Sequence, residues 1–227
     1  MPNTTLPMPN KLQYRIIHSA KRRRIAFRIA PDGVLEVLAP ENTNEVILKT
    51  LIDANRGVIE KLRLRTPLRP PLSFEEGNMF MLLGKPYPLH LTHRLRIFDN
   101  AFMIPRGSEQ EMRHAMIQLY RELALHIISK RIVPFQEAAQ AFPEKVQISS
   151  ANTRWGSCSG QKHITFSWKL IQCPLECVDY VIVHELSHLK EMNHSPKFWK
   201  HVARLIPDYR IKRQKLNAFS AKLPVWD

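Results

Sequence analysis

Asp179-Tyr-Val-Ile-Val-His184-Glu185-Leu-Ser-His188-Leu-Lys-Glu-Met-Asn-His194 is the most informative segment of this 227-residue chain. It contains His-Glu-x-x-His, and a third histidine follows six residues later. On a helix, His184 and His188 project from one face, so both rings can bind one metal ion. Glu185 lies beside them, where its carboxylate can reach a water on the metal without being a ligand. Three neutral ring nitrogens and a water form the open coordination of catalytic zinc.

The residues around this motif indicate that its helix is buried. Apolar side chains occupy nearly the whole helix surface, at Val178, Val181, Ile182, Val183, Leu186 and Leu189. A pair of helical histidines alone is more often a surface or core feature. Buried histidines and a buried glutamate, however, need a strong partner, and a metal ion supplies one. We therefore predict a Zn²⁺ site with His184, His188 and His194 as ligands, and Glu185 as the catalytic residue.

The chain is strongly basic, with 34 Lys and Arg residues against 20 Asp and Glu residues and a net charge of +14. Such a charge favours anionic partners such as nucleic acid, nucleotides or acidic proteins, although part of it can serve solubility. A cluster of four basic residues occupies positions 21–24. It is either a nucleic-acid contact or a solvated turn, and the pattern favours the turn.

Hydropathy and cysteine content bear on where in the cell the protein is found. The chain contains no apolar run long enough for a membrane span, and its first ten residues lack the charged and apolar regions of a signal peptide. Its three cysteines, Cys158, Cys173 and Cys177, are an odd number and do not suggest a disulfide framework. We expect reduced thiols, a cytoplasmic location and no membrane partner.

Alternation and turn signals predict the elements of the first half of the chain. We expect a β-meander over residues 12–38 and one amphipathic helix over 43–64, capped by Asn42 or Thr43. Its inward residues would be Val46, Ile47, Leu51, Ile59 and Leu62. A proline-rich connector should follow at 66–73, and then strands at 80–91, 94–98 and 101–104, with Gly84-Lys85 as a hairpin turn.

The second half should be mainly helical. Ser108 and Glu111 form a capping box that predicts a long helix toward Phe135 or beyond. Strands are expected at 146–149 and 163–170, on either side of a loop at 152–160. The motif helix must end before His194, and Asn193 tolerates the left-handed conformation that such a reversal often requires. Ser195-Pro196 then starts a further helix, and Pro207-Asp208 precedes a last, basic helix.

Three ordered blocks give the chain a specific resemblance to a known family. They are Asn152-Thr-Arg-Trp-Gly-Ser-Cys158, Asp179-Tyr-Val-Ile-Val-His-Glu-Leu-Ser-His-Leu, and Asn193-His-Ser-Pro-Lys-Phe-Trp199. The chain resembles the YgjP-like metallopeptidases, which are related to the SprT-like and WLM zinc proteases. The resemblance implies a zincin-type catalytic domain that cuts proteins or peptides, with the same three histidine ligands and Glu185 as the general base.

The resemblance leaves several residues open to two interpretations. Arg154, Trp155 and Gly156 are either substrate-binding or a buried hairpin corner. Glu191 stands where metzincins carry glycine, and its carboxylate is either an acceptor for a ligand histidine or, as we favour, solvated. Cys158 is either near the metal or, as we favour, a buried thiol. The strand at 163–170 could pair with an extended peptide as an edge strand.

The resulting prediction is an α+β protein. We expect a flexible tail at 1–11, a small N-terminal β-rich region with one helix at 12–105, and a zincin-like helical and β-hairpin metallopeptidase domain at 106–227, packed with the N-terminal region. The expected function is zinc-dependent peptide hydrolysis. The alternatives are a metal-dependent nucleotide phosphoanhydride hydrolase (a pyrophosphatase) and a non-catalytic nucleic-acid-binding module with a structural metal.

Overall fold

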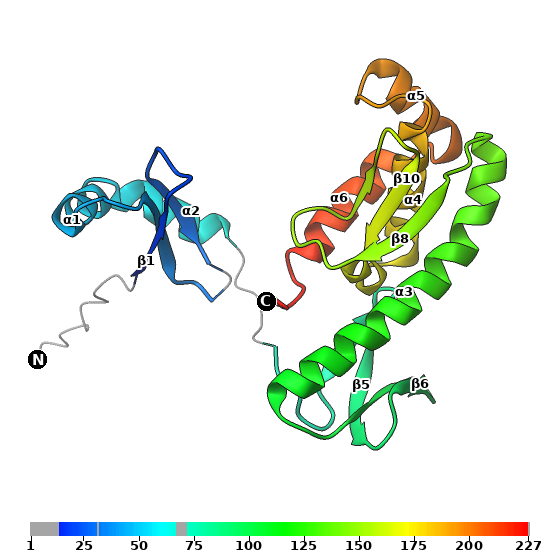
Figure 1. Ribbon diagram of the computed structural model, residues 1–227, viewed down its shortest axis with the longest axis horizontal. Helices are drawn as coiled ribbons and strands as arrows, with labels where there is room; N and C mark the ends of the chain where they lie inside the picture. Colours follow the sequence, from blue (N-terminus) through cyan, green and yellow to red (C-terminus); the bar gives the residue numbers. More distant parts are fainter. Residues whose placement is uncertain (1–13, 31, 67–71, 227) are drawn as a thin grey trace, which may run out of the picture. The chain divides into compact units, whose positions relative to one another are not determined.

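The computed structural model describes residues 14–30, 32–66 and 72–226. The expected tail at 1–11, the start of the first strand and most of the connector at 66–73 lie outside these residues. The described part has a mixed α/β architecture with six α-helices and three small sheets (Figure 1). It forms two compact units, one up to Leu72 that includes the C-terminal residues from Ala221, and one from Ser73 to Ser220. Over the described residues, no helix is long and apolar enough to cross a membrane.

The N-terminal unit contains a three-stranded sheet of order β1-β3-β2. Its strands are β1 (Tyr14–Ser19), β2 (Ala26–Ile29) and β3 (Leu35–Pro40). The predicted meander is wrong, because β1 pairs in parallel with β3, which lies in the centre and pairs antiparallel with β2. The central place of β3 explains why five of its six residues are buried.

Two helices cover this sheet where one was predicted. They are α1 (Glu45–Ala54) and α2 (Arg56–Arg65), and the break falls at Asn55, whose ψ of 15° is not helical. Asn44, rather than Asn42 or Thr43, is the N-cap of α1, since its side chain accepts from the Val46 N–H at 2.8 Å. The inward face is therefore shifted. It consists of Leu48, Ile52 and Ile59, whereas Val46 and Ile47 are exposed.

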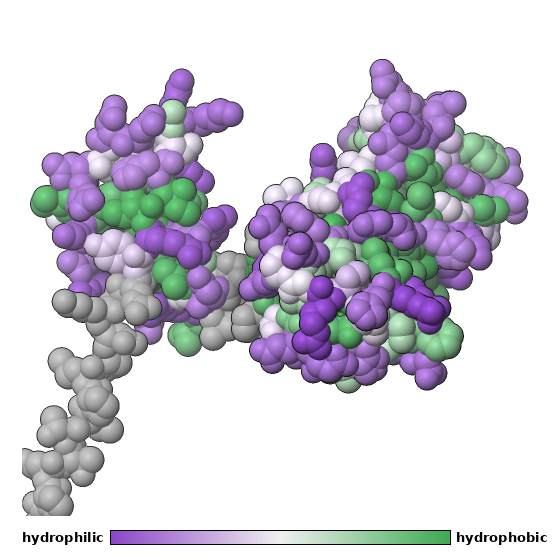
Figure 2. Space-filling view, turned by 60° about the horizontal axis from the view of Figure 1, so that its bottom comes forward, coloured by the Kyte–Doolittle hydropathy of each residue, from purple (hydrophilic) through white to green (hydrophobic). Residues whose placement is uncertain are grey.

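Glu36 of β3 is a charged group in the interior of this unit. Its side chain is 7% exposed and forms ion pairs with Arg15, at 2.8 Å, and with Arg28. Burial alone would raise the pKa of Glu36, but the hydrogen bonds from Arg28 and Arg15 outweigh it, so the pKa lies below its ordinary value. Figure 2 shows a band of hydrophobic residues at the surface of the same unit. The exposed apolar side chains of its two helices include Val46, Ile47, Val58 and Leu64.

The Glu36 ion pairs predict acid-sensitive stability. A depressed pKa stabilises the folded state above the unfolded value, about 4.3, and this contribution disappears as the pH falls through the folded pKa. Glu36→Gln should destabilise the unit by about 1–3 kcal/mol at pH 7, with solvent screening of the two half-exposed guanidinium groups favouring the lower end. Hydrogen exchange over 14–66 should show the gap between the variant and the wild type narrowing as the pH falls below about 4, and a gap that stays constant would contradict this role.

The second unit begins with a four-stranded sheet of order β4-β5-β7-β6. Its strands are β4 (Met79–Leu82), β5 (Lys85–Thr92), β6 (Arg96–Phe98) and β7 (Ala101–Pro105). The hairpin turn lies at Leu83-Gly84, one residue earlier than predicted, with φ values of 50° and 79°. A Cβ on Gly84 would lie 2.9 Å from Pro174 Cα, so the turn packs directly against the start of the motif helix.

Helix α3 (Glu109–Ala139) confirms the predicted long helix and its capping box. In Figure 1 it runs from the sheet containing β5 and β6 to the sheet containing β8 and β10. Its Tyr120 is buried, packs with Phe102 of β7 at a centroid distance of 5.2 Å, and donates to the Met81 carbonyl at 2.7 Å. The four-stranded sheet is thereby joined to the half of the same unit that contains the His-Glu-x-x-His helix. The structure groups residues 73–105 with that half, and the predicted division at 105 stays a prediction.

The third sheet stands beside the motif helix. Its strands are β8 (Lys145–Ser149), β9 (Gly156–Cys158) and β10 (His163–Ser167), in the order β8-β10-β9. The predicted strand at 146–149 is confirmed, whereas the strand at 163–170 ends at Ser167 and continues as a 3-10 helix over Trp168–Gln172. β10 is also not an edge strand, since it pairs with β8 and β9, and β9 lies at the edge instead.

Candidate metal centre and its pocket

Helix α4 (Leu175–His188) carries His184, Glu185 and His188, in the last two turns before it ends. Its apolar side chains are almost completely buried, and the helix is in contact with α3, β9, and the two C-terminal helices α5 (Pro196–Leu205) and α6 (Tyr209–Ser220). A bidentate ion pair between Arg131 of α3 and Asp179, at 2.9 and 2.5 Å, fixes the helix along its length. The motif residues are therefore held on a rigid element.

The chain reverses after α4 and brings His194 back to the helix. The reversal does not use the predicted left-handed Asn193, which is absent from the positive-φ residues of the described chain. The Asn193 side chain instead accepts from the Ser195 N–H at 3.0 Å and so stabilises the turn. Ser195 caps α5 through the Phe198 N–H, and Pro196 is its first residue, which confirms the predicted start of that helix.

The three histidine rings converge on one point. His184 Nε2 and His194 Nε2 are 3.0 Å apart, and one ligand nitrogen from each of His184, His188 and His194 lies within 4.8 Å of the others. The Nδ1–H of His188 donates to the Glu191 carbonyl at 3.1 Å, because a carbonyl can only accept. This bond directs the lone pair of His188 Nε2 toward the other two rings. The acceptor is the backbone of Glu191, not its carboxylate.

The charge state of the rings suits a divalent metal. Burial lowers the pKa of His184 to about 3, assisted by His188, His194 and Arg213, and burial also lowers the pKa of His188. Neutral imidazoles keep the lone pair that a metal needs. His184 Nδ1 is buried and has no hydrogen-bond partner among the residues that the structure describes, so protonation of both nitrogens of this ring would leave a buried charge uncompensated. The donor set therefore fits a divalent ion bound by nitrogen, as in catalytic zinc sites.

Aromatic side chains enclose the triad. The Phe198 ring lies 4.5–4.9 Å from the centroids of all three histidine rings, and Trp199 stacks on His194 at 5.7 Å. The sequence analysis contained both residues only as part of the third family block, Asn193–Trp199, and gave them no role in the site. Their position just after the cap at Ser195 was the signal that could have placed them beside the histidines. A helix that starts at Pro196 turns its first apolar residues toward the reversal that precedes it.

Glu185 is the other buried titratable group of the site. Its residue is 4% exposed, and burial raises the pKa of its carboxyl to about 8, although Arg154 opposes this shift. A cation at the triad would favour the ionised form that accepts a proton. The backbone of Gly156 in β9 lies against this carboxyl, because a Cβ at Gly156 would lie 2.6 Å from Glu185 Oε1. Glycine at this position is therefore required by the close approach of the strand.

The Gly156 contact predicts a loss of activity when a methyl group is added. Gly156→Ala should displace the Glu185 carboxyl or the strand by a fraction of an ångström or more, and displacements near 1 Å can cost on the order of 100-fold in rate. Gly160→Ala is the matched control, since its Cβ would meet nothing within 4 Å. Peptidase kcat/KM together with thermal unfolding would check this, and equal activity of the two variants would exclude the positioning role of Gly156.

The residues before and within β9 differ in their burial and in their contacts. Trp155 is half-buried and its carbonyl accepts from the Ser167 N–H at 2.8 Å, which joins the loop to β10. Arg154 is exposed and acts on Glu185 only through its charge. Cys158 is a free, half-buried thiol, and burial followed by the charge of Glu185 raises its pKa. A thiol with a raised pKa is a poor metal ligand.

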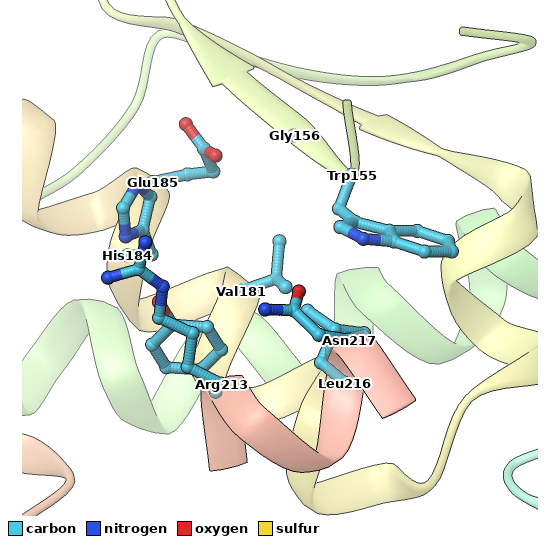
Figure 3. A pocket seen from close by; sticks show the side chains of 9 residues that line it. Trp155, Gly156, Val181, His184, Glu185, Arg213, Leu216 and Asn217 are labelled. Atoms are coloured by element: carbon cyan, nitrogen blue, oxygen red, sulfur yellow. The ribbon is translucent and has the colours of Figure 1, made fainter. Parts of the chain in front are cut away.

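A pocket of about 200 Å³ adjoins the triad. Three elements line it, namely the β9 region, one face of α4 and one face of α6 (Figure 3), through Trp155, Gly156, Tyr180, Val181, His184, Glu185, Arg213, Leu216 and Asn217. Sequence reasoning did not identify Tyr180, Arg213 or Asn217 as site residues. The available signal for Arg213 was its position on the last, basic helix.

Comparisons with known proteins identify the family of the chain. No curated protein matches the chain. The crystal structure of the metallopeptidase zymogen of Pyrococcus abyssi abylysin is similar over 43% of this chain and 99% of its own, with 19% identity and a TM-score of 0.39. That of Methanocaldococcus jannaschii jannalysin covers 39% and 96%, with 21% identity and a TM-score of 0.34. Residues 23–219 match the family described as YgjP-like, metallopeptidase domain. The chain therefore belongs to the YgjP-like metallopeptidase family and is a zinc metallopeptidase-like hydrolase.

Proposed function

We propose that the chain hydrolyses peptide bonds in proteins or peptides, with His184, His188 and His194 holding a zinc ion and Glu185 acting as the general base. The observation that carries the proposal is the convergence of one ring nitrogen from each of three histidines beside a buried carboxyl, with burial lowering the pKa of two of the rings, His184 and His188. The family of the chain implies a divalent metal and a protein or peptide substrate. The nitrogen-only donor set favours zinc over Mg²⁺ or Ca²⁺, which prefer oxygen ligands.

The bound metal supplies Lewis acidity, which lowers the pKa of water and polarises a carbonyl oxygen. The protein's own contribution is the movement and placement of a proton. Glu185 accepts the proton of the attacking water on a carboxylate oxygen and then gives it to the leaving amine. Because the carboxyl is buried against Gly156, it is held in one place for both transfers. The Glu191 carbonyl holds the His188 ring in its orientation.

The edge of the third sheet supports a peptide as the substrate. Among the described strands, β9 pairs with β10 alone, and its Gly156 lies against Glu185. An extended peptide that adds to such an edge would run past the general base with its backbone hydrogen-bonded. The proposed peptide-binding strand is therefore β9, not the 163–170 strand that the sequence suggested.

A substrate screen tests this function. Zinc-loaded protein should cut an unfolded protein into fragments that mass spectrometry identifies by their new termini, and a chelator should stop the reaction. Nucleoside triphosphates, with and without single-stranded DNA, form the comparison arm. Phosphate release without any peptide cleavage would overturn the peptidase assignment and favour the phosphoanhydride hydrolase. Nucleic-acid binding by the basic surface stays a prediction.

A further inference from the structure

The pocket beside the triad has the size of a single side chain. Its volume of about 200 Å³ is below the roughly 300–1,000 Å³ of pockets that hold drug-sized ligands. His184 and Glu185 form part of its wall, so the group that occupies it must lie next to the reacting bond. This inference rests on the proposed function, because the pocket is treated as a binding site for a residue of the substrate.

The pocket has a buried apolar lining next to polar groups, which are the half-buried His184 and the buried Glu185 on one side and the exposed Arg213 and Asn217 at the mouth. Val181, Leu216 and Tyr180 are 4%, 3% and 5% exposed, whereas Arg213 and Asn217 are exposed. Arg213 and Asn217 are four residues apart on α6 and therefore lie on one face of that helix. Such a site can hold a short aliphatic stem against the walls and a charged or polar end at the mouth.

Arg213 is the cation of this mouth, and no carboxylate of the described residues forms an ion pair with it. Two other cations of the same helix are paired, Lys212 with Asp208 at 2.5 Å and Lys215 with Glu176, but no described ion pair involves Arg213. Its guanidinium carbon lies 5.7 Å from the centroid of the Trp199 ring, a contact that orients the side chain. Figure 3 shows the guanidinium beside the His184 ring, while the Glu185 carboxyl points to the other side.

We propose that this pocket binds a carboxylate of the substrate through Arg213 and Asn217, so that the enzyme selects peptides with an acidic group next to the scissile bond. Arginine is the side chain best suited to a carboxylate, because its planar donors match the two oxygens. The Asn217 amide can add a further donor. The carboxylate can come from an Asp or Glu side chain or from the C-terminus of a peptide.

The test compares peptides that differ in one group. Glu, Gln, Leu and Lys are placed in turn at each residue flanking the cut site, with an amidated C-terminus. A second pair ends one residue after the cut site with either a free or an amidated carboxyl. Wild type should prefer the acidic member of one series over its neutral isostere by about 10-fold or more in kcat/KM. The series that shows the preference identifies the source of the carboxylate.

Variants of α6 assign the preference to Arg213. Arg213→Gln should abolish it, and Arg213→Glu should shift it toward Lys. Arg210→Gln removes the same charge from the same helix outside the pocket and should leave the preference intact. If Arg213→Gln lowers kcat/KM equally for the Glu and Gln peptides, Arg213 does not select the substrate and the inference is wrong.

A binding measurement separates this inference from the proposed function. Zinc-loaded Glu185→Gln protein is titrated with fluorescent Glu and Gln peptides and followed by anisotropy, so the result does not depend on turnover. The pocket is supported if the Glu peptide binds more tightly than the Gln peptide and the Arg213→Gln substitution removes this difference, even if no peptide is ever cut. Equal affinity, or no binding of either peptide, overturns the pocket, even if wild type cuts peptides.

Discussion

Replacing Glu185 with glutamine is expected to lower kcat/KM for peptide hydrolysis by about 10²–10⁴-fold, the usual contribution of a positioned general base. Glutamine has nearly the same shape, so it should fit the space against Gly156, but its amide cannot accept the proton of water. The group that could hold a metal consists of the nitrogens of His184, His188 and His194, and Glu185 is not part of it. Zinc content should therefore remain at one ion per chain while kcat/KM falls by this factor.

The experiment measures both quantities on one preparation, zinc by elemental analysis and cleavage by mass spectrometry of the products. Glu137→Gln is the control, since it removes the same charge from an exposed position of α3. It should behave as wild type. Undiminished cleavage by the Glu185→Gln protein would show that another group takes the proton, and loss of zinc would show that Glu185 helps to bind the metal.

Replacing His194 with alanine should weaken zinc binding by more than about 100-fold, because residues that merely support a ligand already contribute roughly 10–100-fold. His194 is exposed and enters the site from the reversal after α4, so its removal leaves no cavity in the core. His184 and His188 would remain as a pair on the helix. Two imidazoles do not complete the three protein ligands of a catalytic zinc site.

Competition titrations with a zinc-binding dye would measure this loss of affinity. His126→Ala is the matched control, because His126 is an exposed histidine of α3 that takes no part in the converging group. Its affinity for zinc should equal that of wild type. If His194→Ala retained the full affinity, a different residue would complete the site.

The candidate site was largely predictable from the sequence, because its chemistry is local. His184, Glu185 and His188 are fixed relative to one another by helix geometry alone. The cap at Ser195 and the proline at 196 confirm where the next helix begins. The conformation of Asn193 was predicted wrongly, because an Asn side chain can stabilise a turn through a hydrogen bond as well as by adopting a left-handed backbone.

The parts that could not be predicted depend on contacts between distant segments. The parallel pairing of β1 with β3 and the central place of β10 are choices between partners that alternation of apolar residues does not distinguish. The break at Asn55 was also not predicted. It divides the expected helix into two and so changes which of its residues are buried. Arg213 enters the pocket because α6 packs on α4, a contact between residues that the sequence separates by about thirty positions.

X-ray absorption at the zinc edge of the loaded wild-type protein tests the metal centre most directly. We expect the zinc to have three imidazole nitrogens and one oxygen as ligands, with zinc–nitrogen distances of about 2.0–2.1 Å. The His194→Ala protein should show one imidazole fewer. A sulfur ligand at about 2.3 Å, or only two imidazoles in the wild type, would contradict the assignment of His184, His188 and His194 as the complete set of protein ligands.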